Sequence, residues 1–95
     1  MRLRVEGQDV RLNEFVARIL ANVAEGICRS LDDIPGDARG VVFTLEMDTG
    51  VTLDVEGSRV RMNAFVQDLV GNILRAMVDS LEGVPAAPRS IELAL

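Results

Sequence analysis

Three arginines near the start of the chain are the candidate binding residues. Arg2, Arg4 and Arg11 lie in a segment that we expect to form a hairpin, in which a two-residue turn would place Arg4 opposite Arg11. Guanidinium groups bind carboxylates and small anions through paired hydrogen bonds. We expect these arginines to be balanced by Glu46 or Asp48 on a neighbouring strand or by a second subunit, with a small anion as the alternative.

The residue types that carry most catalysis are scarce. The chain has no histidine, which removes the commonest general base and neutral metal ligand. Cys28 therefore has no Cys–His pairing, and we expect a half-buried structural cysteine at the edge of an apolar stripe. Asp32, Asp33 and Asp37 lack the spacing of a calcium-binding loop, so we expect a solvated loop there. We expect no catalytic residue, no metal and no cofactor.

The triplet Asp48-Thr49-Gly50 follows an apolar run and resembles the active-site triplet of aspartic proteases. The resemblance implies a half-enzyme that dimerises to pair two aspartates. It covers three residues, and Val51 stands where that family has a small residue. Those proteases are nearly all-β, whereas this chain predicts two long helices. We therefore expect a hairpin turn with Gly50 at positive φ.

The two halves of the chain are similar when residues 50 positions apart are compared. Identical residues meet at Leu3/Leu53, Val5/Val55, Glu6/Glu56, Gly7/Gly57, Val10/Val60, Arg11/Arg61, Asn13/Asn63, Phe15/Phe65, Val16/Val66, Asn22/Asn72, Ser30/Ser80, Leu31/Leu81, Pro35/Pro85, Arg39/Arg89 and Leu45/Leu95. Each half is near the size at which a core alone no longer suffices for stability. We therefore expect one domain over residues 1–95, built from repeat 1 (1–48) and repeat 2 (51–95).

Each repeat begins with a predicted hairpin. Apolar and polar residues alternate on both sides of Gly7-Gln8 and of Gly57-Ser58. Glycine at the first central position favours a type II′ turn, which suits the twist of the flanking strands. In the second repeat this register places Asp54 opposite Arg61.

A long segment with helical periodicity follows each hairpin. Asn13 and Asn63 are suited to cap these helices, which we expect to end near Asp32 and Glu82. We expect the core to be formed by the apolar stripes, with a phenylalanine in the first turn of each as the anchor. The stripes are Phe15, Val16, Ile19, Leu20, Val23, Ile27 and Leu31, and then Phe65, Val66, Leu69, Val70, Ile73, Met77 and Leu81.

An alternating strand follows each helix, over residues 41–47 and 91–95. The fold class is therefore α+β, an internal tandem repeat ββαβ–ββαβ with one mainly antiparallel sheet and two helices on one face. If the short second strands do not pair, the fold reduces to a ferredoxin-like βαββαβ.

Several polar residues of the helices are matched between the repeats. At three matched positions the two repeats carry residues of opposite charge: Arg18/Asp68, Glu25/Arg75 and Arg29/Asp79. If the helices pack antiparallel, we expect Arg18 to meet Asp79 and Arg29 to meet Asp68, as in a former symmetric dimer, with drift of a solvated surface as the alternative.

Smaller polar residues also recur in both repeats. We expect Asn22 and Asn72 at the seam between the helices. We expect the hydroxyls of Ser30 and Ser80 to bond the carbonyl four residues back, with a polar pocket as the alternative.

Charge and composition restrict the function. The net charge of -5 argues against a nucleic-acid partner, and no apolar run is long enough to span a bilayer. The single cysteine fits a reducing compartment, so we expect a cytoplasmic protein. We expect a non-enzymatic, oligomerising structural or protein-interaction domain, most simply a homodimer. The alternative is a small-ligand regulatory module that binds an anion or metabolite.

Overall fold

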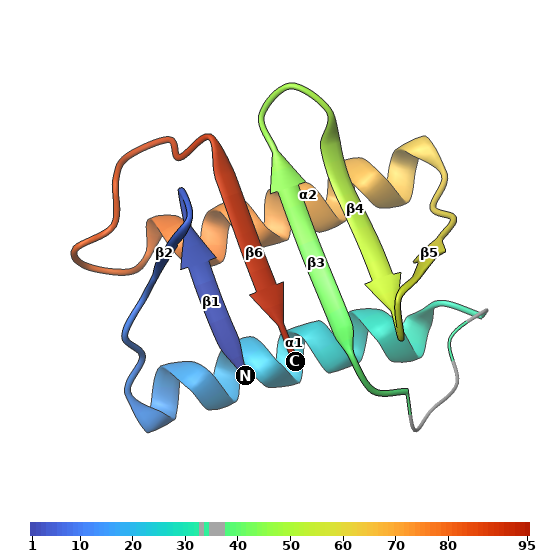
Figure 1. Ribbon diagram of the computed structural model, residues 1–95, viewed down its shortest axis with the longest axis horizontal. Helices are drawn as coiled ribbons and strands as arrows, with labels where there is room; N and C mark the ends of the chain where they lie inside the picture. The colour runs from blue at the N-terminus through green and yellow to red at the C-terminus, as the bar shows by residue number, and fades with distance from the viewer. Residues whose placement is uncertain (33, 35–37) are drawn as a thin grey trace.

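The structure is a computed structural model that describes residues 1–32, 34 and 38–95. The described chain forms one sheet and two helices, α1 (Glu14–Ser30) and α2 (Ala64–Asp79) (Figure 1). The strands are β1 (Arg2–Val5), β2 (Gln8–Asp9), β3 (Val41–Glu46), β4 (Gly50–Val55), β5 (Ser58–Val60) and β6 (Ser90–Ala94). The predicted α+β class is confirmed.

The sheet interleaves strands from the two ends of the chain. Its order is β2-β1-β6-β3-β4-β5, and every neighbouring pair is antiparallel. The C-terminal strand β6 lies between β1 and β3, so each half of the chain contributes to both sides of the sheet centre. The elements before residue 48 and those after it follow the same order of types.

One row of residues crosses the middle of the sheet and forms the centre of the core. Leu3 pairs with Leu93, Leu93 with Phe43, and Phe43 with Leu53. These side chains are at most 2% exposed. Phe43 and Leu93 lie 50 positions apart in the sequence and pair across the two central strands, β3 and β6.

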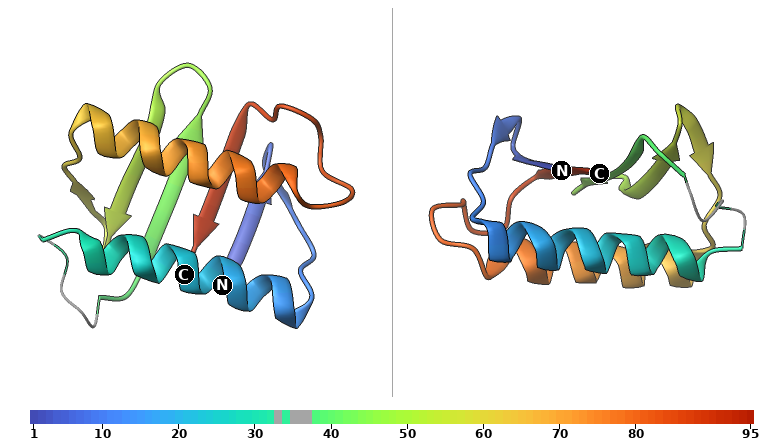
Figure 2. Two further views of the ribbon diagram at one scale, coloured as in Figure 1. Left: turned by 180° about the vertical axis from the view of Figure 1, so that it is seen from behind. Right: turned by 90° about the horizontal axis from the view of Figure 1, so that it is seen from below.

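The two helices form a second layer on one face of the sheet. They run antiparallel, side by side, and cross the strands, while the other face of the sheet is uncovered (Figures 1 and 2). Asn13 and Asn63 cap the helices as predicted, because each side-chain oxygen accepts a hydrogen bond at 2.8 Å from the backbone N–H three residues later. The helices end two to three residues before the predicted ends, at Ser30 and Asp79.

The prediction of which side of each helix is buried is partly wrong. The buried residues of α1 are Leu20, Ala24 and Cys28, and those of α2 are Val70, Gly71, Leu74 and Val78. The predicted core anchors Phe15 and Phe65 are 65% and 73% exposed. The apolar stripe is wider than the contact with the sheet, because it continues around each helix to the surface. The residues at the middle of the predicted stripe are therefore not the residues that contact the sheet.

The hairpin turns also differ from the prediction. They consist of Glu6-Gly7 and Glu56-Gly57, whose φ angles are 51° and 79°, and 52° and 82°. Two successive positive φ angles define a type I′ turn, in which glycine takes the second position. The register therefore pairs Arg4 with Asp9 rather than Arg11.

The second hairpin shifts in the same way, and Asp54 pairs with Arg59 rather than Arg61. The short second strands β2 and β5 do pair with β1 and β4. The condition for the ferredoxin-like alternative is therefore not met.

The link between the halves is a tight turn, as predicted. Residues 47–49 connect β3 to β4, and Gly50 has a φ of 86° and pairs with Glu46. Asp48 is exposed in this turn. Neither helix of the described chain is long and apolar enough to cross a membrane.

Candidate functional site

The first two candidate arginines lie on the uncovered face of the sheet. The Nε atoms of Arg2 and Arg4 donate to the same oxygen, Oδ1 of Asp9, at 3.0 and 3.1 Å. The revised hairpin register brings Asp9 beside Arg4, and Glu92 of β6 lies opposite Arg4 on the other side. The carboxylate that binds these arginines is therefore Asp9 and not Glu46 or Asp48.

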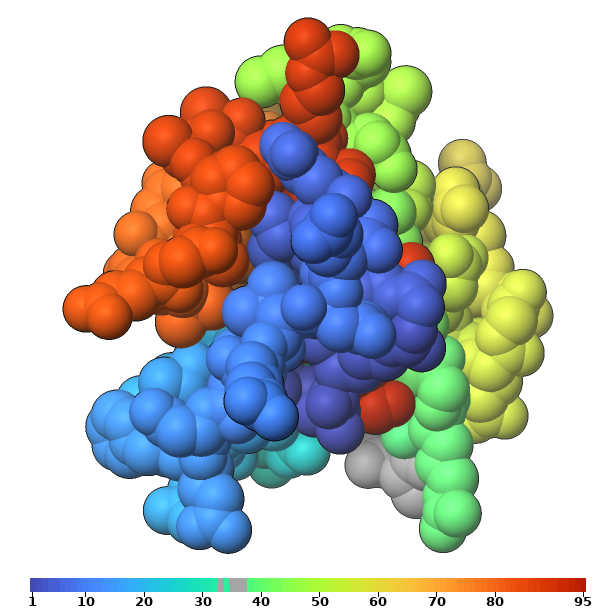
Figure 3. Space-filling model, turned by 60° about the vertical axis from the view of Figure 1, so that its left-hand side comes forward, coloured from blue at the N-terminus to red at the C-terminus, as the bar shows by residue number. Residues whose placement is uncertain are grey.

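Arg11 lies apart from this pair. It lines a hollow of about 390 Å³ between β2 and the segment that follows α2, where Glu6, Asp9 and Glu82 also contribute. In Figure 3 this region lies where the blue segment that leads into α1 approaches the orange end of α2. Asp9 is already paired with Arg2 and Arg4, and Glu6 accepts a hydrogen bond from the Arg89 N–H, so these carboxylates are partly compensated within the chain. The structure does not bring the three arginines together into one site.

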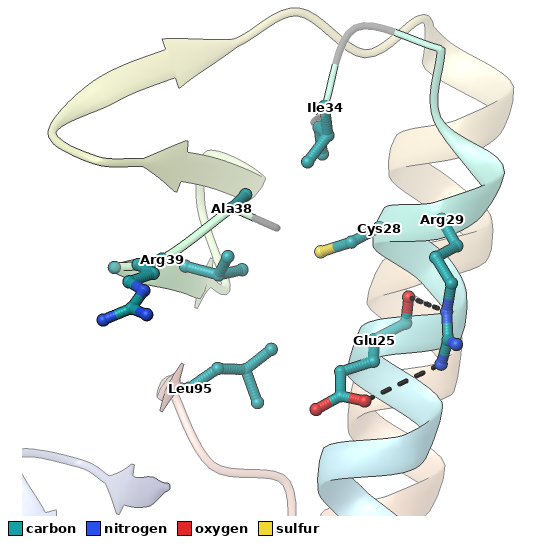
Figure 4. Close-up of a pocket in the computed structure, with 9 residues that line it drawn as sticks. Glu25, Cys28, Arg29, Ile34, Ala38, Arg39 and Leu95 are labelled. Atoms are coloured by element: carbon teal, nitrogen blue, oxygen red, sulfur yellow. Dashed lines mark hydrogen bonds and ion pairs between the residues drawn. The ribbon is translucent and has the colours of Figure 1, made fainter. Parts of the chain in front are cut away.

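A larger hollow, of about 560 Å³, lies beside the C-terminal part of α1. Figure 4 shows its lining: Cys28 points from the helix across the hollow toward the side of Ala38 and Arg39, Glu25 and Arg29 lie on the helix, and Leu95 lies at the end of the sheet. Arg29 Nη2 pairs with Glu25 Oε2 at 3.7 Å. The hollow thus combines an apolar floor with a charged rim, a pattern typical of small-molecule sites.

Cys28 is a core residue rather than the half-buried residue that we predicted. Its side chain is 8% exposed and belongs to the main apolar cluster. Burial raises the pKa of the Cys28 thiol above its ordinary value, and the negative charge of Glu25 raises it further. Both effects keep the thiol protonated, so Cys28 is a poor nucleophile.

Two glutamates that sequence reasoning did not single out hold the hairpin turns to the sheet. Glu6 Oε2 accepts a hydrogen bond from the Arg89 backbone N–H at 3.2 Å, and the Glu6 N–H donates to Ser90 at 3.0 Å. Glu56 makes the equivalent bonds, accepting from the Arg39 N–H at 3.5 Å and donating to Gly40 at 3.2 Å. These contacts offset the cost of a positive φ at a non-glycine residue. The recurrence of Glu-Gly in both repeats was the available signal.

Exposed large apolar side chains lie in the first two turns of both helices. Four of the six exposed large apolar side chains of the described chain are Phe15, Ile19, Phe65 and Leu69. They belong to a stripe of exposed residues, spaced three and four apart, on the side of each helix away from the sheet. We call this stripe the outer helix face; it consists of Phe15, Arg18, Ile19, Asn22, Glu25 and Arg29 on α1, and Phe65, Asp68, Leu69, Asn72, Arg75 and Asp79 on α2.

The predicted charge contacts between the helices are not observed. The ion pairs found among residues 1–32, 34 and 38–95 join Arg2, Arg4, Arg29 and Arg59 to carboxylates on the same hairpin or the same helix. Asn72 accepts from Arg75 at 3.3 Å, within α2. On the outer helix face, Arg29 pairs with Glu25 and Arg75 donates to Asn72, both within one helix. The side chains of Arg18, Asp68 and Asp79 are exposed.

The remaining candidates are placed as follows. Ser30 and Ser80 bond the carbonyls of Gly26 and Ala76 at 2.9 Å, as predicted, although both serines are exposed. Asp32 is exposed, while Asp33 and Asp37 lie outside the described residues. Within the described residues no cluster of three or more side chains could hold a metal ion.

Comparison of the chain with protein-family models, curated proteins and solved structures finds no significant match.

Proposed function

We propose that this chain is a small non-enzymatic domain that associates with itself and acts as a structural or protein-interaction module. The observation that supports this proposal is the outer helix face, where Phe15 and Phe65 are 65% and 73% exposed. Large exposed apolar patches are characteristic of interaction surfaces, because leaving them in water is unfavourable. A homodimer is the simplest assembly, since closed two-fold symmetry is the commonest in soluble oligomers.

The chemistry of the chain supports a non-enzymatic role. The chain has no histidine, and its single thiol is buried with a raised pKa. A catalytic cysteine needs a lowered pKa or an adjacent base. A buried free thiol also agrees with the proposed cytoplasmic, reducing location.

Sedimentation equilibrium over a wide range of concentrations tests self-association. We expect the average mass to rise from that of the 10.3 kDa chain toward twice this value as concentration increases. A monomer mass at every concentration would contradict the proposal and would favour the second candidate function.

The second candidate is a small-ligand module, which the hollow beside α1 favours. Arg29 and Arg39 lie at its rim above Cys28 and Leu95. Arg29 is paired with Glu25, so Arg39 is the arginine that could bind an anionic group, while Cys28 and Leu95 suit an apolar part of the ligand. Thermal unfolding with a series of short fatty acids tests this candidate. A rise in the melting temperature of the wild type, lost in Arg39→Gln, would support it.

We further infer that the chain is a single domain derived by duplication of one ββαβ unit. The matched hydrogen bonds of Glu6 and Glu56 support this inference, as do the equivalent caps of Asn13 and Asn63. In addition, Phe43 pairs with Leu93, its match in the other half.

A further inference from the structure

The outer helix face carries charges of opposite sign on its two helices. At matched positions, α1 has Arg18 and Arg29 where α2 has Asp68 and Asp79, and all four are exposed. Glu25 offsets one arginine of α1 and Arg75 offsets one aspartate of α2, so the face has a net positive half and a net negative half, each beside exposed apolar side chains. A surface of this kind is complementary to a rotated copy of itself.

We propose that a second copy of this chain docks on the outer helix face, so that α1 of each copy covers α2 of the other. The two copies are related by a two-fold axis that runs parallel to the helices, between the two helix layers. This inference rests on the proposed self-association and specifies its interface.

Symmetry determines which residues meet. Rotation about an axis parallel to the helices leaves the position of each residue along that axis unchanged. Each residue of α1 therefore comes to lie over the α2 residue that is its neighbour within the same chain. The start of α1 lies beside the end of α2, since Val16 and Leu81 line one hollow.

If residues 16 and 81 are taken as level, the antiparallel course of the helices makes Arg18 level with Asp79 and Arg29 level with Asp68. In the dimer Arg18 then faces the partner's Asp79, and Arg29 faces the partner's Asp68. The remaining charged positions, Glu25 and Arg75, face asparagine side chains rather than like charges. Four pairs of opposite charge form across the interface, two from each copy.

The alternative stacking is electrostatically unfavourable. A two-fold axis perpendicular to the helices would place α1 on α1 and α2 on α2. Arg18 would then face the partner's Arg29, and Asp68 would face the partner's Asp79. Like charges at an interface oppose association, so the charge pattern selects the arrangement in which α1 covers α2.

The edges of the sheet are poorly suited to dimer formation. The edge strands are β2, with two residues, and β5, with three. Short polar edges such as Gln8–Asp9 offer few backbone groups to a second sheet. The outer helix face instead offers two helices about 25 Å long. With a helix spacing of about 10 Å, it covers an area on the order of 500 Å². This is smaller than the roughly 800 Å² of accessible surface that each partner buries in a standard interface, so the dimer interface would be a small one.

Reversal of the charges on one helix tests this arrangement. One variant carries Arg18→Asp and Arg29→Asp, and a second carries Asp68→Arg and Asp79→Arg. Each variant places like charges across all four pairs. We therefore expect each variant to be monomeric at concentrations where the wild type is dimeric, with the Kd of dimerisation raised at least tenfold. When the two variants are mixed, opposite charges face each other again, and we expect a heterodimer in sedimentation equilibrium. A protein with all four substitutions should form a homodimer for the same reason.

A matched control separates the interface from the effect of net charge. Arg61→Asp with Arg89→Asp changes the net charge by the same amount as the first variant, at exposed positions outside the outer helix face. We expect this control to remain dimeric, and circular dichroism should show native helix content in every variant. If both helix variants dimerise as tightly as the wild type, the interface is elsewhere while self-association stands. A monomeric wild type would overturn both proposals.

Discussion

At the scale of single residues, exposure decides how much a side chain contributes to stability. Phe15 and Phe43 are both phenylalanines, yet Phe15 is 65% exposed and Phe43 is fully buried at 0%. We expect Phe43→Ala to lower the free energy of unfolding by about 3–5 kcal/mol, through lost burial and a cavity. Phe15→Ala should lower it by less than about 1 kcal/mol at concentrations where the protein is monomeric. Urea denaturation measures both, and a large loss from Phe15→Ala would place that ring in the core.

The buried thiol of Cys28 makes stability depend on pH. Because burial and Glu25 raise the pKa of this thiol in the folded state, the folded protein holds the proton more tightly than the unfolded chain. The resulting stabilisation is fully present below the unfolded pKa of about 8.5 and is lost as the pH rises through the folded value. We expect the wild type to lose stability relative to Cys28→Val as the pH rises above about 8.5.

Cys28→Val is the matched comparison for this pH dependence, since valine occupies the equivalent position 78. Urea unfolding of both proteins at pH 7.5 and at pH 10 makes the measurement. An unchanged difference between the two proteins at both values would show that the thiol does not titrate differently on unfolding.

At the scale of elements, the start of each helix depends on one asparagine. The side chains of Asn13 and Asn63 satisfy the N–H groups of Val16 and Val66. Replacement by alanine leaves a donor of the first turn without its partner. We therefore expect Asn13→Ala and Asn63→Ala each to cost about 1 kcal/mol of stability. Thermal or urea unfolding at monomeric concentrations checks this expectation.

Asn22→Ala is the control for the two caps. Asn22 is exposed in the interior of α1, where alanine has the higher helix propensity. Its replacement should therefore leave stability unchanged or slightly increased. Equal losses from Asn22→Ala and Asn13→Ala would contradict the assigned role of the caps.

At the scale of the whole molecule, neither half can build its own sheet. In the sheet order, β6 separates β1 from β3, and β3 separates β6 from β4. A fragment of residues 1–48 therefore lacks the strand between its own two long strands, and a fragment of residues 51–95 has the same defect. We expect each fragment alone, when monomeric, to show no cooperative unfolding transition. Mixing the two should restore one, as judged by circular dichroism.

Self-association of one fragment would be compatible with this expectation, because a second copy supplies the missing strand. The mass of each fragment must therefore be measured beside its unfolding. A demonstrably monomeric half with a cooperative transition would contradict the interdependence of the halves.

Local patterns in the sequence determined the elements and their caps. Alternation placed β3 and β6, and asparagine before each helical period identified Asn13 and Asn63. These features depend on backbone conformation within a few residues, which the chain specifies locally. Leu3, Phe43, Leu53 and Leu93 were recognisable as inward-facing residues for the same reason.

Tertiary structure alone decided the features that depend on distant neighbours. The apolar stripe of each helix is wider than the sheet can cover, so only packing showed that Phe15 faces solvent while Cys28 is buried. The type I′ turn was decided by the bonds that Glu6 makes to Arg89 and Ser90, more than 80 residues away in the sequence. The strand order had the same origin. Insertion of β6 between β1 and β3 pairs backbone groups and buries apolar faces that neither half of the chain can pair or bury alone.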